Sequence, residues 1–256
     1  MAAAEPPAHV SRYAAAEYWD SRFEQEDEYE WFRGYEAFRH LVERQVQPHH
    51  RVLVLGCGNS ALAEDLWRLS GVTAIESTDL SATVVERMRA RALKQGLPPT
   101  LTWNVADMRS LPFVASSFDC VIEKGALDCL QVGVRDPWNL PDDVQQTCRQ
   151  VLEEAHRVLR PGGCFLSVTF SAPHFRRPLL RDGPFTWRVA HDTFGGEWHY
   201  HLYTCVTGQK GADEVEPDER LADSQPWTGE PLTHEHMDEP DYLMRCGLDE
   251  EEEGPA

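Results

Sequence analysis

The stretch VLVLGCGNSALAEDL, residues 52–66, decides which fold the chain can adopt. Four apolar residues lead directly into Gly56-Cys57-Gly58, and apolar residues then recur at helical spacing. This pattern predicts a buried strand, a tight glycine turn and the first turns of a helix. Because glycine has no side chain, such a turn lets a bound cofactor come close to the backbone.

The glycine turn fits the pattern G-x-G-x-x-G/A, with Ala61 at its last position. Asp79 follows 23 residues after Gly56, near the spacing expected of a carboxylate that binds a ribose diol. On this motif alone, three interpretations stay open. They are a nicotinamide dinucleotide, S-adenosylmethionine, and a tight turn that binds no ligand.

Strand-like and helix-like segments alternate along most of the chain. We expect strands at residues 51–55, 72–78, 101–105, 118–123 and 164–170, and helices at residues 14–23, 35–46, 60–69, 81–95 and 142–159. Ser81 is a suitable N-cap, and Pro161-Gly162-Gly163 is expected to stop the long helix before the last of these strands. The alternation predicts βαβ units and a parallel sheet. Residues 185–194 and 197–206 flank two glycines and predict an antiparallel hairpin at the sheet edge.

Polar residues follow the first four expected strands, where a doubly wound sheet binds its ligand. Asp79 is suited to accept hydrogen bonds from both hydroxyls of a ribose, although a helix cap is the alternative. Asp107 can accept from the amino group of an adenine, with Met108 on the ring face and Leu80 against it; a plain surface loop is the alternative. No Lys or Arg stands where it would hold a pyrophosphate, which favours S-adenosylmethionine over a dinucleotide.

Several motifs occur in an order that resembles the seven-strand S-adenosylmethionine-dependent methyltransferases. They are LGCGNS (55–60), TDLS (78–81), ADMRSLPF (106–113), SFDCVIEKGALD (117–128) and RVLRPGG (157–163). The resemblance extends over about residues 13–208. It implies an α/β fold, with a doubly wound, mostly parallel seven-stranded Rossmann-like sheet that ends in an antiparallel hairpin. It also implies S-adenosylmethionine as cofactor, with Gly56 and Gly58 beside its methionine part and ribose.

A narrower set of motifs resembles the lysine methyltransferases of translation elongation factor 1-alpha. The set comprises EYWDSRF (17–23), LGCGNS (55–60), EKGALD (123–128), RDPW (135–138) and SAPHFR (171–176). This resemblance implies methyl transfer to a lysine of the elongation factor in the cytoplasm. It also implies that Trp19, Phe23 and Trp31 contribute to the cofactor site, although anchoring of helices to the domain is the alternative. Lys124 is implied to touch the amino-acid end of the cofactor. The chain departs from this family in its more acidic tail and in residues 177–185.

Glu123 is the candidate catalytic group. A lysine must lose a proton before its nitrogen attacks the methyl carbon, and a carboxylate at the end of this strand can accept it. Glu123 could instead bind the ammonium group of the cofactor or pair with Lys124, and Asp128 is a weaker candidate. Alignment of nitrogen, methyl and sulfur without a strong base is a further alternative.

Histidines near the expected hairpin do not predict a metal site. His199 and His201 share one face of a strand, with His191 and Cys205 nearby, but the spacing lacks a third ligand. Methyl transfer needs no metal, so we expect none. His174 is expected at the ligand face, where either a structural role or a role in shaping the channel for the substrate lysine fits.

Composition divides the chain into three parts: an aromatic-rich helical lid (1–46), a methyltransferase domain (47–210) and an acidic tail (211–256). The tail holds 16 acidic residues and two arginines, so it carries −14 of the net charge of −19, and we expect it to be disordered. The acidic balance argues against nucleic acid as a partner. No apolar run is long enough to span a membrane, no secretory signal is visible, and seven scattered cysteines favour the cytoplasm.

The leading interpretation is therefore a protein-lysine methyltransferase with an elongation factor as its partner. A small-molecule methyltransferase is the alternative within the enzymes, and a cofactor-binding scaffold without activity is the alternative outside them. A nicotinamide dehydrogenase is the third, although no residue set for hydride chemistry is visible. The motif Asp/Asn-Pro-Pro-Tyr of amide and nucleobase methyltransferases is absent, because Glu123-Lys124-Gly125 stands in its place.

Overall fold

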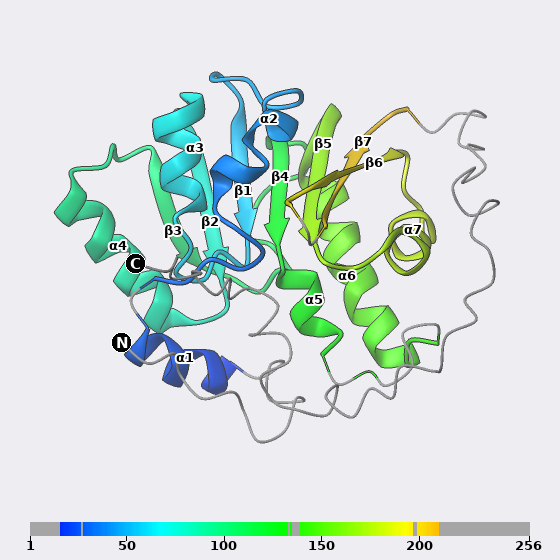
Figure 1. Cartoon of the computed structure of the whole chain (residues 1–256), viewed down its shortest axis with the longest axis horizontal. Coiled ribbons are helices and arrows are strands. Elements are labelled where there is room, and N and C mark those ends of the chain that lie inside the picture. Colours follow the sequence, from blue (N-terminus) through cyan, green and yellow to red (C-terminus); the bar gives the residue numbers. More distant parts are fainter. Residues whose placement is uncertain (1–15, 27, 133, 135–138, 197–198, 210–256) are drawn as a thin grey trace, which may run out of the picture.

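Seven strands form one mixed sheet at the centre of the molecule (Figure 1). The structure is a computed structural model that describes residues 16–26, 28–132, 134, 139–196 and 199–209. The expected acidic tail and the first fifteen residues of the expected lid lie outside these ranges. In the described part of the chain, no helix is both long and apolar enough to cross a membrane.

The order of the strands across the sheet is β3-β2-β1-β4-β5-β7-β6. Five strands are parallel: β1 (Arg51–Leu55), β2 (Ala74–Asp79), β3 (Leu101–Val105), β4 (Phe118–Lys124) and β5 (Leu159–Thr169). The hairpin of β6 (Arg188–Phe194) and β7 (Tyr200–Val206) completes the sheet, with β7 antiparallel to both β5 and β6. The expected doubly wound, mostly parallel fold with a terminal hairpin is confirmed.

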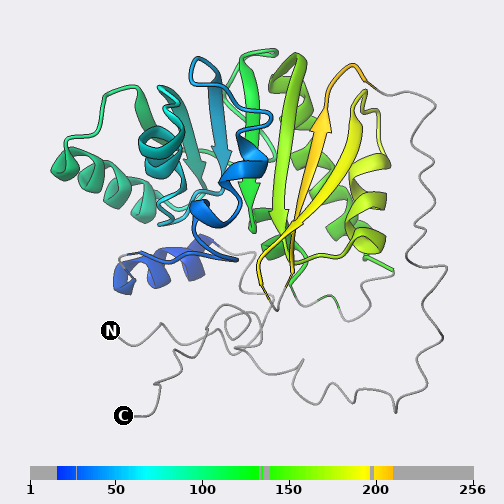
Figure 2. The same ribbon diagram turned by 45° about the horizontal axis from the view of Figure 1, so that its top comes forward.

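Helices cover both faces of this sheet. α3 (Leu62–Ser70) and α4 (Ala82–Gln95) pack on one face, and α6 (Asp142–Val158) and α7 (Pro173–Arg181) pack on the other. The short helices are η2 (Tyr35–Ala37), α2 (Arg39–Val42) and α5 (Ala126–Leu130). Figures 1 and 2 both show α1 (Ala16–Gln25) beyond the carboxyl ends of the parallel strands, on the same side as α5.

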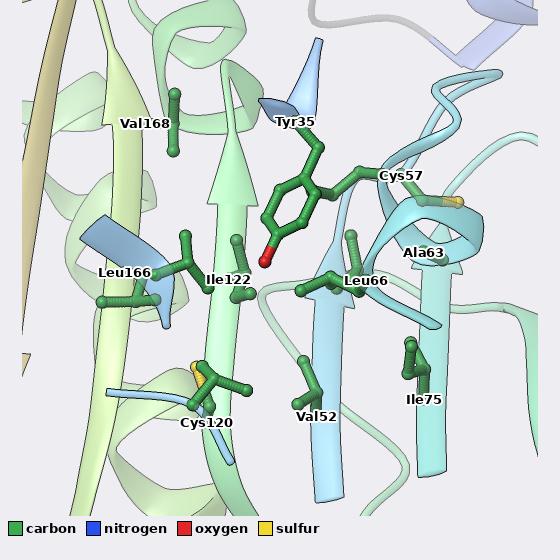
Figure 3. Close-up of a cluster of buried hydrophobic side chains, with 14 of the residues drawn as sticks. Tyr35, Val52, Cys57, Ala63, Leu66, Ile75, Cys120, Ile122, Leu166 and Val168 are labelled. Atoms are coloured by element: carbon green, nitrogen blue, oxygen red, sulfur yellow. The ribbon is translucent and has the colours of Figure 1, made fainter. Parts of the chain in front are cut away.

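Alternation along the strands divides the core into two clusters. Val52 and Val54 of β1 face the α3 and α4 side, whereas Leu53 and Leu55 face the α6 and α7 side. The segment before β1 completes the first cluster. Figure 3 shows the ring of Tyr35 lying over this cluster near Ile122, and its hydroxyl is 2.7 Å from the Ser70 hydroxyl at the end of α3.

Helix ends follow the expected signals in α4. Ser81 is its N-cap and its hydroxyl accepts from the Val84 N–H at 3.2 Å. Gly96 ends the helix in the left-handed region with φ of 66°, and its N–H bonds back to the last turn. A positive φ at this C-terminal position is common and favours glycine.

Several expected boundaries shift by two or three residues, and two elements differ more strongly. Residues 35–46 do not form one helix, because Phe38 adopts φ of −124° and interrupts it between η2 and α2. Its side chain is fully buried and contacts Phe194, so core packing overrides the helical pattern. In addition, β5 begins at Leu159 and runs through the Pro-Gly-Gly turn. Gly163 lies so close to β4 that an added Cβ would be 2.9 Å from the Asp119 carbonyl oxygen.

Phe38→Ala is expected to destabilise the fold by about 3–5 kcal/mol, because the change leaves a cavity in the first core cluster. The measurement is the free energy of unfolding in urea. Leu93→Ala is the matched control, since the Leu93 side chain on α4 is 84% exposed and its loss is expected to cost little. Equal losses in the two variants would show that residues 35–42 do not belong to the core.

Candidate functional site

A cavity of about 320 Å³ lies at the carboxyl ends of β1 to β4, and Trp19 and Phe23 of α1 contribute to its lining. Its lining combines the glycine turn, the residues after β2, β3 and β4, and the aromatic N-terminal segment. The structure brings together all ten residues that the sequence predicts for the cofactor: Trp19, Phe23, Trp31, Gly56, Gly58, Asp79, Leu80, Asp107, Met108 and Lys124. A concave site of this size, mostly apolar with a few polar groups, is suited to a small molecule.

The glycine turn disfavours side chains at Gly56 and Gly58. Gly56 and Gly58 have φ of 57° and 49°, in the left-handed region that favours glycine. A Cβ on Gly56 would lie 2.7 Å from the Cβ of Ala126 at the start of α5, and one on Gly58 would lie 3.4 Å from the Phe23 ring. The turn therefore exposes backbone to the cavity between α5 and the N-terminal segment.

The carboxylate of Asp79 is fixed by the backbone around it. One oxygen accepts from the Gly58 N–H at 2.8 Å and the other from the Ser81 N–H at 2.9 Å. Burial raises the pKa of Asp79, and these backbone hydrogen bonds partly offset that effect. A carboxylate has about four acceptor positions, so acceptor capacity remains for a ligand hydroxyl. Ser81 caps α4 itself, which leaves Asp79 available for a ligand.

Asp107 has a partner of its own that the sequence analysis missed. The Arg109 guanidinium donates to both of its oxygens, at 2.9 and 2.6 Å, and the hydrogen bonds from Arg109 lower the pKa of Asp107. Arg109 also lines the cavity. Arg109 stands two positions after Asp107, and this spacing alone does not indicate that the two side chains pair. Contact between Asp107 and an adenine stays a prediction.

Aromatic rings from the N-terminal segment close the cavity on one side. Trp19 stacks on Phe23 with ring centroids 5.6 Å apart. The Arg22 guanidinium lies over the rings of Trp19, Tyr29 and Trp31 at 5.6, 5.1 and 5.4 Å. Cation–π attraction of this kind holds the rings together. Tyr29 lines the cavity and was not predicted, although it belongs to the same aromatic-rich stretch.

Lys124 reaches from the end of β4 to the N-terminal segment. Its Nζ donates to the Glu30 carboxylate at 2.6 Å and to the Trp31 carbonyl oxygen at 2.7 Å. Burial lowers the pKa of Lys124, and the negative charge of Glu30 opposes that effect. Glu30 is a further residue that the sequence does not predict for the site. It is one of several acids in a segment without periodicity, so no sequence signal separates it from the others.

Glu123 does not line the cavity. Its side chain is fully buried on the α6 and α7 side, where it accepts from the Leu127 N–H at 3.2 Å and from the Ser167 hydroxyl. Burial raises the pKa of Glu123 to about 7. These contacts fix the start of α5, which supplies part of the cavity wall. The geometry gives Glu123 a role in positioning α5, and proton transfer by Glu123 stays a prediction.

Asp128 belongs to the same buried cluster. One oxygen accepts from the Thr169 hydroxyl at 2.6 Å and from the Arg176 guanidinium at 2.7 Å. Burial raises the pKa of Asp128, while the charge of Arg176 opposes the shift. Asp128 does not line the cavity either. Arg176 ties α7 to α5 through this pair, a contact that its position in the sequence does not reveal.

The histidines lie apart from this cavity. His191 Nε2 and His201 Nδ1 are 2.8 Å apart on the hairpin, and burial lowers the pKa of His201 to about 4. His174 lines a second cavity of about 110 Å³ between α6 and α7. Within the residues that the structure describes, no group of three or more His, Cys, Asp or Glu side chains is placed to hold a metal ion.

Comparison with known proteins identifies relatives of the chain. The family model described as "Methyltransferase domain" matches residues 53–167. The "EEF1A lysine methyltransferase 4" of Bos taurus is 41% identical over 209 residues, covering 80% of each chain. The "eEF1A lysine and N-terminal methyltransferase" of Xenopus laevis is 32% identical over 68% of this chain and 24% of the relative.

A solved structure supports the fold. It is the complex of the Haloferax volcanii Trm112 methyltransferase activator with a putative methyltransferase, matched with a TM-score of 0.56 and 19% identity. The match covers 78% of this chain and 98% of that one. At this level of identity, the likeness establishes the architecture alone.

Gly56→Ala is expected to lower the affinity for S-adenosylmethionine at least tenfold, because the new Cβ collides with Ala126 and displaces the turn. Calorimetric titration measures this effect. Gly96→Ala is the matched control: Gly96 has a similar φ of 66°, and nothing lies within 4 Å of an added Cβ. The control is expected to lose about 1 kcal/mol of stability while keeping its affinity. Equal affinities in the two variants would contradict the close approach at Gly56.

Glu123→Gln is expected to gain stability relative to the unmodified chain as the pH rises. The folded state raises the pKa of Glu123 from 4.5 to about 7, so it holds a proton that the unfolded chain releases. The stability of the unmodified chain therefore falls between these two pH values and stays lower above them. Urea unfolding across this range tests the trend, with the exposed Glu153→Gln as control. A difference between Glu123→Gln and the unmodified chain that is independent of pH would contradict it.

Proposed function

This chain belongs to the family of the EEF1A lysine methyltransferase 4 proteins, and on that premise we propose that it methylates a lysine of translation elongation factor 1-alpha with S-adenosylmethionine as methyl donor. The observation that carries the proposal is the cavity in which the ten residues predicted for the cofactor converge. The substrate rests on the names of relatives that share about 40% of their residues with 80% of this chain.

The residues of the cavity fit S-adenosylmethionine. The glycine turn offers a cradle that a Cβ at Gly56 would fill, and Asp79 keeps acceptor capacity for the ribose hydroxyls. Met108 and Leu80 are apolar neighbours suited to the faces of an adenine. When bound, S-adenosylmethionine supplies a methyl group on a positively charged sulfur, to which the aromatic rings of Trp19 and Trp31 are attractive neighbours.

The chain contributes to the reaction chiefly by orientation and by exclusion of water. Aromatic residues of the N-terminal segment line the cavity, and the Asp79 carboxylate, fixed by its backbone contacts, would hold the ribose hydroxyls. Glu123 is turned away from the cavity, so alignment of the lysine nitrogen with the methyl group supplies most of the rate enhancement in this proposal.

A nicotinamide dehydrogenase is disfavoured by the contacts of Glu30. In dinucleotide-binding folds, the pyrophosphate lies at the N-terminus of the helix after the glycine turn. Here the carboxylate of Glu30 accepts from the Ala61 N–H at that position, at 2.6 Å. A pyrophosphate at this position would be repelled by the carboxylate of Glu30.

We further propose that the chain acts in the cytoplasm, where its substrate works in translation. The six cysteines within the described residues are free thiols, which suits a reducing compartment. The acidic net charge of −19 supports a protein partner rather than a nucleic acid.

Methyl transfer from radiolabelled S-adenosylmethionine to purified elongation factor 1-alpha tests the proposal. We expect label on a lysine of the factor, and a loss of at least tenfold in rate with Asp79→Ala, which removes the ribose contact. Asp192→Ala, at an edge-strand position outside the cavity, is the control and is expected to keep full activity.

The other outcomes separate the alternatives. Label on small molecules alone would replace the proposed substrate by a small-molecule one. Binding of S-adenosylmethionine without label on any acceptor, in cytosolic protein or in the small-molecule fraction, would favour the scaffold.

A further inference from the structure

The N-terminal strap, defined here as residues 28–34, crosses the cavity between α1 and η2. Its residues Tyr29 and Trp31 line the cavity. Two consecutive residues at its far end, Phe32 and Arg33, have φ of 60° and 104°. Residues with side chains seldom adopt such values, so contacts elsewhere must hold the strap in this conformation.

Glu30 supplies polar contacts to one wall of the cavity. Its carboxylate accepts from the Ser60 hydroxyl at 2.9 Å and from the Ala61 N–H at 2.6 Å. Ala61 is the N-cap residue of α3, where free N–H groups and the helix dipole favour a negative charge. The strap is thereby bound to the glycine-turn side of the cavity.

The same carboxylate reaches the opposite wall. Lys124, at the end of β4, donates to Glu30 at 2.6 Å and to the Trp31 carbonyl oxygen at 2.7 Å. The Lys124 side chain is only 4% exposed. A buried ammonium group is costly unless it is paired, so loss of the carboxylate leaves a charge without compensation. Glu30 thus links both walls of the cavity through the strap.

Phe32 adds an apolar contact beside this polar link. Its ring lies over Gly125, where an added Cβ would be 3.1 Å from the ring edge. The ring also contacts Phe170 and Tyr200, with centroids 5.7 Å away in each case. This apolar contact holds the end of the strap against the core, whereas Glu30 holds the part that covers the cavity.

We propose that Glu30 is a positioning residue that latches the strap over the bound methyl donor and so sets how long donor and product stay bound. The proposal rests on the proposed function for the identity of the cofactor. Because Tyr29 and Trp31 of the strap line the cavity and Glu30 joins its two walls, release of a bound molecule requires the strap to move. The two sets of contacts that Glu30 makes must break in that motion, so they slow dissociation more than association.

Stopped-flow tryptophan fluorescence measures these rates, since Trp19 and Trp31 line the cavity. The probes are S-adenosylmethionine and S-adenosylhomocysteine with the full chain. Glu30→Gln keeps the shape of the side chain and removes its charge. We expect dissociation to accelerate at least tenfold, with an association rate within about threefold of the unmodified value.

Glu28→Gln is the matched control, because it makes the same change of charge on the same strap. Its side chain is 56% exposed and pairs with Arg91 at 3.2 Å, so solvent screens the interaction. We expect its dissociation rate to stay within twofold of the unmodified chain. Glu30→Asp keeps the charge but shortens the reach, and we expect a rate between those of Glu30→Gln and the unmodified chain.

Lys124→Met and the double variant with Glu30→Gln test the link itself. If the two groups act as one latch, the double variant releases the donor about as fast as the faster single variant. Dissociation from Glu30→Gln at the rate of Glu28→Gln would overturn the latch. Should Glu30→Gln fail to fold, an unmodified rate in Glu30→Asp would overturn it in the same way.

The result is separable from the proposed function. Donor binding by the unmodified chain together with unchanged rates in the Glu30 variants would remove the latch and leave the methyltransferase untouched. An unmodified chain that binds neither probe would overturn the cofactor assignment, and the latch with it.

Discussion

Parallel pairing of β1 with strands on both of its sides is the constraint on which the rest of the structure depends. β2 and β4 each run in the same direction as β1, in register along nearly its whole length. The carboxyl ends of β1, β2 and β4 therefore lie side by side at one edge of the sheet. The chain turns there after each of these three strands. The glycine turn, Asp79 and Lys124 meet at this edge because of that geometry, although Gly56 and Lys124 are 68 positions apart in the sequence.

Much of this arrangement could be predicted from sequence, because local patterns determine it. The bounds of β1 and β3 agree with the expected ranges, and Ser81 caps α4 as predicted. Strands bounded by glycine or aspartate carry strong local signals. The single helix expected over residues 35–46 is wrong because the burial of Phe38 against the distant Phe194 outweighs a helical pattern.

The contacts within the site were harder to predict. Glu30 meets partners 31 and 94 residues away, and no short motif records a contact over that separation. The orientation of Glu123, however, could be predicted from the alternation of side chains along a strand. Side chains alternate along β4, so Glu123 and Lys124 cannot both face the cavity, and Val121 shares the buried face of Glu123. Placing both beside the cofactor overlooked this period of two.

The long separation between the strap and β4 has a consequence for synthesis of the chain. Residues 28–34 are made early, yet the ammonium group that pairs with Glu30 belongs to a residue made 94 positions later. The ring contact between Phe38 and Phe194 likewise cannot form until residue 194 has been synthesised. During translation, the aromatic N-terminal segment stays without these partners until most of the sheet has emerged. The N-terminal segment is thus the first part of the cavity to leave the ribosome and among the last to gain its contacts. Until the sheet forms, its exposed aromatic side chains need protection from aggregation.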